Sequence, residues 1–180
     1  MARPKHRTQA AATYFVTTST RQHMPLLQHP ATATIVEQAI FRYRDQGHFL
    51  VHRHVVMPDH FHAILTPSAT TSLEKSMQLI KGGSSYDAGK KLEKKLPLWQ
   101  AGFTEHQIRD QRDFDTHVTY IDENPVKARI VEQPSEYQWC SARSIYRLDD
   151  WPQASAAKAG ADVVDDSAEL KLRPSQRTKV

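Results

Sequence analysis

Two stretches rich in β-branched and aromatic residues, separated by Pro58 and Asp59, constrain the fold of this chain more than any other feature. Residues 49–57 and 60–66 each favour an extended strand. Proline followed by aspartate favours a tight turn, because proline fixes one backbone angle and aspartate bonds the backbone that follows it. The pattern therefore predicts an antiparallel hairpin at this point.

The second strand of this hairpin has two chemically different faces. Phe61, Ala63 and Leu65 alternate with the two histidines of the stretch. Side chains two residues apart point the same way in a strand, so His60 and His62 project together, opposite the apolar residues. Two neighbouring imidazoles are an arrangement that binds metal ions. A half-exposed strand with a polar face gives the same pattern, so the pattern alone is compatible with a metal site and with a polar strand face.

A helix is predicted over residues 113–124. Phe114, Val118 and Ile121 form an apolar stripe, and Pro125 is expected to end the helix. The polar residues Asp113, His117, Tyr120 and Asn124 cluster on an adjacent face. Tyr120 and Asn124 are one turn apart, so a phenol and an amide lie one above the other.

The order of the predicted elements sets the fold class. They are a strand at 13–19, a helix at 32–45, the hairpin, a helix from 71 that Gly82–Ser85 interrupts and that resumes to 96, a strand at 104–109, and the helix at 113–124. This order predicts an α+β sandwich, with a central antiparallel sheet and helices mainly on one face.

Length and composition favour one domain with flexible ends. Residues 13–147 are expected to form the domain, 1–12 a basic flexible arm, and 148–180 a mostly disordered tail. The formal net charge is +4, and residues 1–147 hold 19 Lys and Arg against 14 Asp and Glu, as a nucleic-acid binder requires. Cys140 is the single cysteine and no run of about 18 apolar residues exists, so a cytoplasmic location is expected.

Four blocks in order resemble the HUH single-tyrosine nucleases, small transposases and domesticated relatives that cut single-stranded DNA. The blocks are 56–62; then 99–103 with 105–106 and 108–109; then 117–121 with 124–128; and 137–142. The last two are most similar to the REP-associated tyrosine transposases, the branch that acts on repetitive extragenic palindromes. The resemblance covers about residues 13–147.

This resemblance implies a ferredoxin-like fold and a defined set of site residues. Tyr120 would form a 5′-phosphotyrosine link to DNA and leave a free 3′-hydroxyl, so rejoining needs no ATP. His60 and His62 would hold Mg²⁺ or Mn²⁺, and Asn124, where many relatives carry glutamine, would supply an oxygen ligand directly or through water. By ligand chemistry alone, two imidazoles and an amide favour manganese, zinc or another transition ion over magnesium.

Single-stranded or hairpin DNA is the implied partner. Candidate phosphate contacts are Lys81, Arg109, Arg112, Lys127 and Arg129; the group Lys90, Lys91, Lys94 and Lys95 is equally consistent with a solvated helix face. The aromatic side chains of Trp99, Phe103 and Trp139 could stack on unpaired bases. For at least two of the three, packing in the core is expected instead. His52 and His54, on the first hairpin strand, are expected to face solvent or DNA.

The favoured function is a metal-dependent single-stranded DNA endonuclease and strand transferase, acting on hairpin-forming palindromes. One alternative is a sequence-specific DNA-binding or regulatory protein on the same fold that does not cleave. Another is a metal-dependent hydrolase whose nucleophile is water, which needs no tyrosine. A homodimer and a monomer are both compatible with the sequence.

Overall fold

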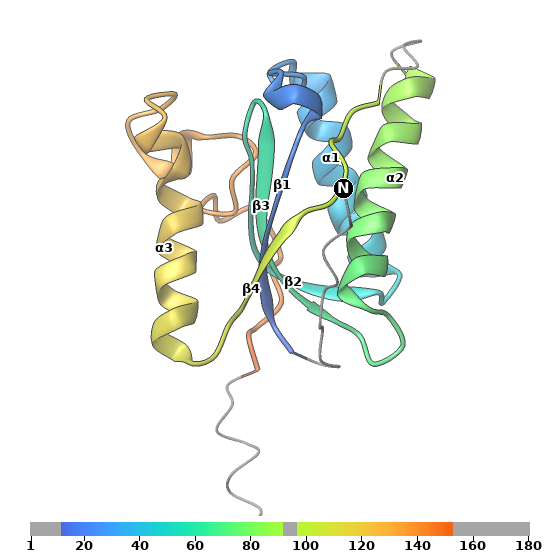
Figure 1. The fold of residues 1–180 in the computed structure, drawn as a ribbon. Helices are drawn as coiled ribbons and strands as arrows, with labels where there is room; N and C mark the ends of the chain where they lie inside the picture. The colour runs from blue at the N-terminus through green and yellow to red at the C-terminus, as the bar shows by residue number, and fades with distance from the viewer. Residues whose placement is uncertain (1–11, 92–96, 153–180) are drawn as a thin grey trace, which may run out of the picture.

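A computed structural model describes residues 12–91 and 97–152 of the chain (Figure 1). Most of the predicted arm and tail, together with Lys94 and Lys95, lie outside these residues. The elements are β1 (Tyr14–Ser19), η1 (Arg21–His23), α1 (Pro30–Asp45), β2 (Phe49–Val56), β3 (His60–Pro67), α2 (Leu73–Lys91), β4 (Thr104–Gln107), α3 (Gln111–Lys127) and η2 (Pro134–Glu136). Within the described ranges, no helix combines the length and apolar character that crossing a membrane requires.

The strands form one sheet in the order β2-β3-β1-β4, and every neighbouring pair is antiparallel. Strands β1 and β2, which α1 joins, are therefore parallel, with β3 between them. Strands β3 and β4, which α2 joins, are likewise parallel, with β1 between them. This is the split β-α-β arrangement of ferredoxin-like folds. The α+β, ferredoxin-like prediction is confirmed. Figure 1 shows α1 and α2 together on one face of the sheet and α3 on the other.

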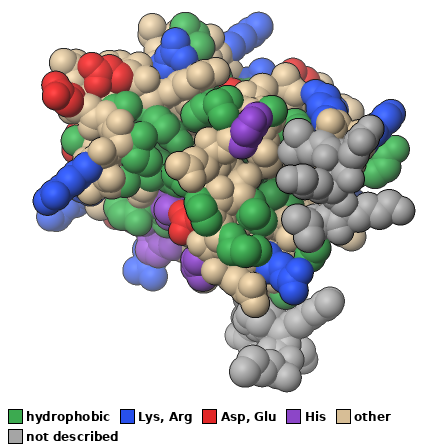
Figure 2. All heavy atoms as spheres, turned by 90° about the horizontal axis from the view of Figure 1, so that it is seen from above, with side chains coloured by type: hydrophobic (Ala, Val, Ile, Leu, Met, Phe, Trp, Pro, Cys, Tyr) green, Lys and Arg blue, Asp and Glu red, His purple; other side chains and the backbone are tan. Residues whose placement is uncertain are grey.

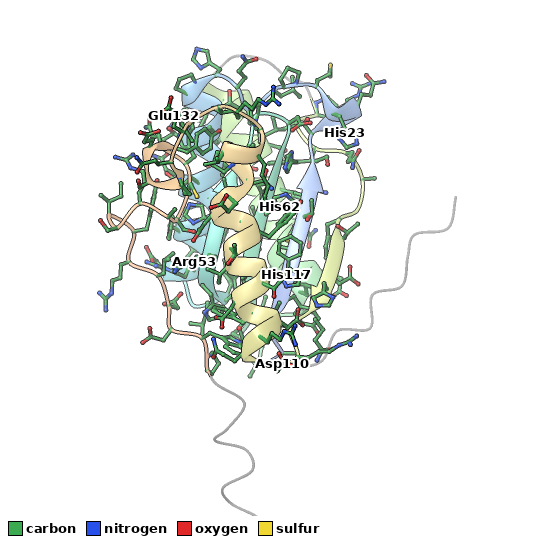
Figure 3. The ribbon with its side chains drawn as sticks, turned by 90° about the vertical axis from the view of Figure 1, so that its left-hand side faces the viewer. His23, Arg53, His62, Asp110, His117 and Glu132 are labelled. Carbon is green, nitrogen blue, oxygen red and sulfur yellow. The ribbon has the colours of Figure 1, made fainter. Side chains whose placement is uncertain are left out.

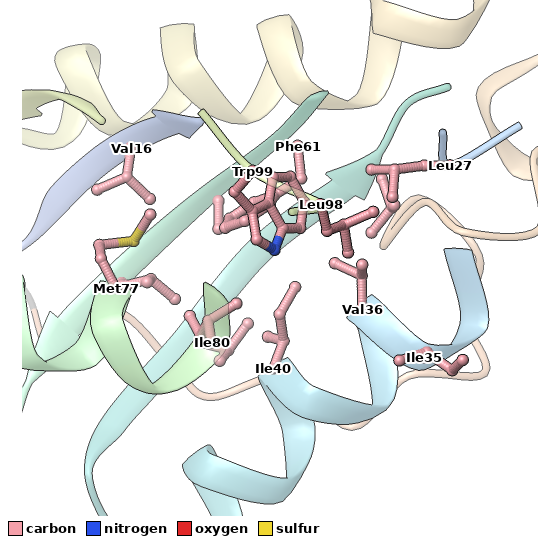
Figure 4. Packing of buried hydrophobic residues seen from close by; sticks show 14 of the residues in the cluster. Val16, Leu27, Ile35, Val36, Ile40, Phe61, Met77, Ile80, Leu98 and Trp99 are labelled. Carbon is pink, nitrogen blue, oxygen red and sulfur yellow. The ribbon is translucent and has the colours of Figure 1, made fainter. Parts of the chain in front are cut away.

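Each face of the sheet has its own apolar core. On the α1 and α2 side, Val16 and Phe61 pack with Ile40, Ile80 and Trp99 (Figure 4). Each large apolar side chain fully buried there contributes about 1.5–3 kcal/mol. The core under α3 is smaller, and its members are Val55, Met57, Ile64, Ile108, Ile121, Tyr137 and Cys140, with Phe114 and Val118 packed against them. The predicted apolar stripe of this helix is confirmed.

Helix α2 runs without a break through Gly82 and Gly83, so the predicted interruption is wrong. A Cβ atom on Gly83 would stand 2.6 Å from the Tyr43 hydroxyl oxygen of α1. The glycine therefore permits close packing of the two helices and does not end either one. Nearby, Arg42 of α1 and Asp87 of α2 form an ion pair at 2.8 Å.

The two histidines of β2 are buried, which contradicts the prediction that they face solvent or DNA. The pairing of β2 with β3 shifts register after Val51, so the pattern of alternating faces is broken at His52. The His52 ring bonds to Thr66 at 2.8 Å, whereas the His54 ring bonds to Glu37 of α1 at 3.1 Å. The irregularity thus sends the two histidines to different partners inside the protein.

Helix α3 continues past Pro125 to Lys127, so the expected end at the proline is wrong. Two bonds close the last turn after the proline: Ile130 N–H donates to the Pro125 carbonyl oxygen at 3.0 Å, and Arg129 N–H donates to that of Val126 at 2.8 Å. These two bonds form a Schellman motif. Arg129 has a φ of 57° and occupies the left-handed position that usually holds glycine.

The chain after residue 147 packs against the domain as far as Trp151. Asp149 pairs with Val51 in both directions, accepting its N–H through the side chain at 2.8 Å and donating its own N–H at 2.9 Å. Trp151 stacks on Phe114 with ring centroids 4.5 Å apart. The described residues therefore continue past residue 147, and the rest of the predicted tail lies outside them.

Candidate active site

The two histidines of β3 project from the sheet face that α3 covers, as their spacing requires. Their ring centroids lie 4.7 Å apart. His62 is 5% exposed, whereas His60 is only partly buried. Figure 3 looks onto α3 and shows His62 beside the helix, with His117 nearer the start of the helix, close to Asp110.

Both rings are oriented through the same nitrogen. Nδ1 of His60 lies 2.6 Å from the Asp59 carboxylate, and Nδ1 of His62 lies 2.7 Å from the Thr17 hydroxyl. Metal-binding histidines characteristically use one nitrogen for such an orienting bond and the other for the ion. Nε2 of each ring is the nitrogen left for a ligand.

Burial keeps the second imidazole in the form that can coordinate a metal. Desolvation, together with the neighbouring His60, lowers the pKa of His62 to about 3, and Asp59 opposes this shift only in part. His62 is therefore neutral at physiological pH. Only a neutral imidazole has the lone pair that a metal ion needs.

Tyr120 lies against this pair from the opposing helix. Its ring centroid is 5.2 Å from that of His62 and 5.7 Å from that of Phe15. The side chain is 42% exposed, so one edge of the ring packs while the remainder faces solvent. The Lys127 ammonium lies 5.7 Å from the ring centroid. The site thus combines an accessible phenol, a cation and two imidazoles.

Asn124 lies one turn beyond Tyr120 on α3 and is partly buried. Its carbonyl oxygen accepts the Ala128 N–H within the helix, at 3.0 Å. Its amide side chain as a metal ligand remains a prediction. With the two Nε2 atoms, the donor set would be two nitrogens and one oxygen, which fits a divalent transition ion.

Four of the five predicted phosphate contacts flank α3 and are exposed: Arg109, Arg112, Lys127 and Arg129. Lys81 is different, because its ammonium donates to the Gln100 carbonyl oxygen at 2.9 Å and to that of Gly102. Desolvation also lowers the pKa of Lys81 to about 8. Its position on α2 places it on the other side of the sheet, and a role in DNA binding stays a prediction for all five.

The tryptophans and Phe103 belong mainly to the core. Trp99 is buried and donates its indole N–H to Ser84, while Trp139 donates to Thr34. Phe103 is partly buried against the same core. The prediction that at least two of these three pack internally is confirmed.

Two positions at the site, Phe15 and Thr17, escaped the sequence patterns. Phe15 contacts His62 and Tyr120, and Thr17 orients His62, because β1 pairs with β3 in the register Thr17 to His62. That register is a tertiary property, and no local motif encodes it. His106, by contrast, belongs to one of the sequence blocks that resemble the family. Its hydrogen bond to Asp113 could not be predicted, because it depends on how β4 packs against α3.

A second group of histidines surrounds Asp113 on the same side of the sheet. Nε2 of His106 lies 2.9 Å from the Asp113 carboxylate, and Nδ1 of His117 lies 3.1 Å from it. Although desolvation raises the pKa of Asp113, the His106 bond and the Arg109 N–H together lower it below its usual value. Seen from above, Figure 2 shows several histidine side chains close together beside acidic and basic side chains, and another histidine apart from them.

Comparison with known proteins adds independent information. The chain matches the family described as "Transposase IS200 like" over residues 8–124. A REP-associated tyrosine transposase of Escherichia coli (strain K12) is 31% identical over 140 residues, covering 74% of this chain and 76% of that protein. A relative from Haemophilus influenzae is 27% identical over 108 residues, which are 54% of this chain and 61% of the relative.

The fold also resembles a solved structure, that of a REP-associated tyrosine transposase bound to a REP hairpin. The TM-score is 0.66 and the sequence identity 28%, with 97% of this chain and 100% of that chain covered. The likeness extends over the whole ferredoxin-like sheet and its helices.

Proposed function

Because this chain belongs to the IS200-like transposase family, as a REP-associated tyrosine transposase, we propose that it is a metal-dependent endonuclease and strand transferase for single-stranded DNA. The observation that carries the proposal is the contact of Tyr120 with His62, at 5.2 Å between ring centroids. An exposed phenol and an imidazole with a free nitrogen meet there, on two different elements of the fold.

Tyr120 is the proposed nucleophile. Its hydroxyl oxygen bonds to phosphorus at the scissile phosphate, the bond from phosphorus to the 3′-oxygen breaks, and the phenol proton is lost while the 3′-oxygen gains one. The products are a 5′-phosphotyrosine and a free 3′-hydroxyl. Reversal of this exchange joins a new 3′-hydroxyl, so the covalent link conserves the energy needed for strand transfer.

His60, His62 and Asn124 would hold a divalent ion, Mg²⁺ or Mn²⁺, which would act as a Lewis acid on the phosphate. Asp59 and Thr17 orient the imidazoles, so each presents Nε2. Lys127, 5.7 Å from the Tyr120 ring centroid, supplies positive charge where the phenol oxygen and phosphate accumulate negative charge.

The proposed substrate is a hairpin-forming palindrome with an unpaired flank. The structural relative is described as bound to a REP hairpin. Exposed arginines lie at the start of α3 and Lys127 and Arg129 at its end, with Tyr120 between them. A single strand that follows the helix would contact both groups, whereas the partner strand of a duplex would obstruct approach to the phenol. The proposed location is the cytoplasm, and a monomer and a dimer are both compatible with the proposal.

The direct test is incubation with end-labelled hairpin DNA carrying single-stranded flanks, in Mn²⁺, followed by denaturing electrophoresis. Wild-type protein should give a cut strand and a protein-linked product, and Tyr120→Phe should give neither while still binding DNA. Tyr86→Phe is the matched control, because Tyr86 is also an exposed tyrosine, 70% exposed, on α2.

Three contrary results separate the alternatives. Binding without any cleavage by the wild-type protein would favour a regulatory DNA-binding protein. Cleavage without a covalent product would favour a hydrolase that uses water. A fully paired duplex cut as fast as the same strand alone would contradict the proposed substrate form. Binding should also weaken steeply with added salt, because phosphate contacts release counterions.

A further inference from the structure

A cluster of three possible ligands joins β4 to α3, separate from the histidines of β3. It consists of His106 on β4 with Asp113 and His117 on α3, and we name it the β4–α3 cluster. Each of its three side chains offers one atom that can bind a metal ion, and these three atoms all lie within 4.8 Å of one another. Among the described residues, it is the group of three or more His, Cys, Asp or Glu side chains that meets this condition. Phe15 separates it from the proposed active site, stacking on His62 at 5.3 Å and contacting His117 at 4.6 Å.

The geometry of the cluster is close to that of a metal shell. A zinc ion lies about 2.0–2.1 Å from its nitrogen and oxygen ligands, so ligand atoms in a tetrahedral shell stand about 3.3–3.4 Å apart. His106 Nε2 and the Asp113 carboxylate are 2.9 Å apart, and His117 Nδ1 and the same carboxylate are 3.1 Å apart. The His106 and His117 rings stack with centroids 4.7 Å apart. Small outward movements would admit an ion.

The chemistry of the donors is selective. Two imidazole nitrogens and one carboxylate oxygen suit zinc and similar transition ions, whereas Mg²⁺ prefers oxygen ligands alone. In this structure the same atoms are joined by hydrogen bonds. Both imidazole rings lie within hydrogen-bond distance of the Asp113 carboxylate, and His117 Nδ1 also lies 2.9 Å from the Asp113 backbone carbonyl oxygen. A bound ion would replace the protons on the imidazole nitrogens that make these bonds. The side chains are 39%, 21% and 19% exposed for His106, Asp113 and His117, so an ion and a water ligand can enter.

We propose that the β4–α3 cluster is a second metal site, which binds one zinc-like divalent ion with His106, Asp113 and His117. The ion ties the edge strand β4 to the first two turns of α3, the helix that carries Tyr120. It therefore stabilises the position of this helix against the sheet. The binding itself does not depend on whether Tyr120 cleaves DNA.

The test counts bound ions in the full, untagged chain by calorimetry with Zn²⁺ and by the visible absorption of Co²⁺. In a His60→Ala/His62→Ala variant, one ion should remain bound, and the Co²⁺ spectrum should show nitrogen and oxygen ligands. Adding His106→Ala/His117→Ala should remove that ion. Asp113→Asn should weaken Zn²⁺ binding at least tenfold and is a second variant if the double histidine change disturbs folding. His23→Ala, an exposed histidine elsewhere, should change nothing.

A second readout is thermal. Zn²⁺ should raise the melting temperature of the His60→Ala/His62→Ala variant by several degrees, because the ion binds the folded state, and should not raise that of the same protein lacking His106 and His117. The proposal is overturned if the first variant binds no ion, or if its ion survives loss of both cluster histidines. Neither result bears on DNA cleavage, so failure here is distinct from failure of the proposed function.

Discussion

The His-x-His pairs on β2 and β3 share a sequence pattern but differ in their surroundings. In β3, His60 and His62 each use Nδ1 in an orienting bond, which leaves Nε2 for a ligand, and the His62 ring lies 5.2 Å from that of Tyr120. In β2, His52 uses both nitrogens in hydrogen bonds, and His54 is fully buried, with its second nitrogen enclosed by the core. The comparison shows that a free nitrogen outside the closed core, and not the spacing, separates a candidate ligand from a structural histidine.

A directed chain of hydrogen bonds explains why His52 is structural. The Trp151 indole N–H donates to the Thr13 hydroxyl at 2.9 Å, which donates to Thr66 at 2.7 Å. Thr66 in turn donates to Nε2 of His52, whose Nδ1 donates to the Asp149 carbonyl oxygen at 2.9 Å. For a neutral His52 ring this order follows, because an indole only donates and a carbonyl only accepts. Burial lowers the pKa of His52, which favours the neutral ring.

The largest expected difference between the pairs is in activity. His60→Ala or His62→Ala should reduce cleavage by more than about 100-fold, because even the loss of an orienting partner to a metal ligand costs about 10–100-fold. His52→Asn and His54→Asn should leave the cleavage rate of the folded protein within about twofold, as neither ring reaches Tyr120. The measurement is the cleavage rate across Mn²⁺ concentrations, at a temperature where every variant is folded. Equal losses from all four changes would show that the wrong pair has been assigned.

Stability should show the reverse order. His54→Ala should lower the free energy of unfolding by about 2–4 kcal/mol, since it leaves a cavity and removes one of the hydrogen-bond partners of Glu37. His60→Ala should cost less than about 1 kcal/mol, because its side chain is partly exposed and its bond to Asp59 is near the surface. Denaturant unfolding of the metal-free proteins measures both. A larger loss for His60→Ala than for His54→Ala would break the comparison.

The sequence predicted what depends on local periodicity. The alternation in β3 and the stripe of Phe114, Val118 and Ile121 are visible in the residues alone, and the structure has both. What could not be predicted depends on tertiary contacts. The shift after Val51 is invisible locally, and it changes the environment of His52.

The predicted helix interruption at Gly82–Ser85 and the predicted helix end at Pro125 were wrong for a related reason. Gly83 is indistinguishable in sequence from a helix breaker, but its role is to let Tyr43 of another helix approach. Pro125 sits within the last turn of α3, which is closed by bonds from residues that follow it. In the candidate site, the pairing of Thr17 with His62 required the order of strands in the sheet, which follows from the whole fold.

The two threonine partners of the histidines sharpen the comparison. Thr17 bonds to His62 at 2.7 Å, and Thr66 bonds to His52 at 2.8 Å. Thr17→Val should weaken metal activation of cleavage by about 10–100-fold. Thr66→Val should leave activation unchanged but lower the free energy of unfolding by about 1–2 kcal/mol, because it breaks the buried chain. Mn²⁺ titration of cleavage and denaturant unfolding test the two changes; identical profiles for both variants would refute separate roles.

The smallest expected effect is a pH dependence of stability that comes from His52. Burial lowers the pKa of this ring below 6.5, although Asp149 and Asp150 oppose the shift and Arg53 adds to it. The unfolded chain takes up a proton near pH 6.5 and the folded ring only below that, so unfolding binds a proton. The stabilising contribution is therefore complete above pH 6.5 and is lost as the pH falls toward the folded-state pKa.

Between pH 7.5 and 5.5, this ring should account for at most about 1.4 kcal/mol of the lost free energy of unfolding in the metal-free protein. His52→Gln keeps a donor and an acceptor but cannot be protonated in this range, so its stability should fall less steeply than that of the wild type. His62, with a pKa lowered to about 3, contributes equally to both proteins and cancels in the difference. His23→Gln, at an exposed position, controls for the loss of an imidazole. Parallel curves for His52→Gln and the wild type would mean that the buried chain accepts a protonated ring.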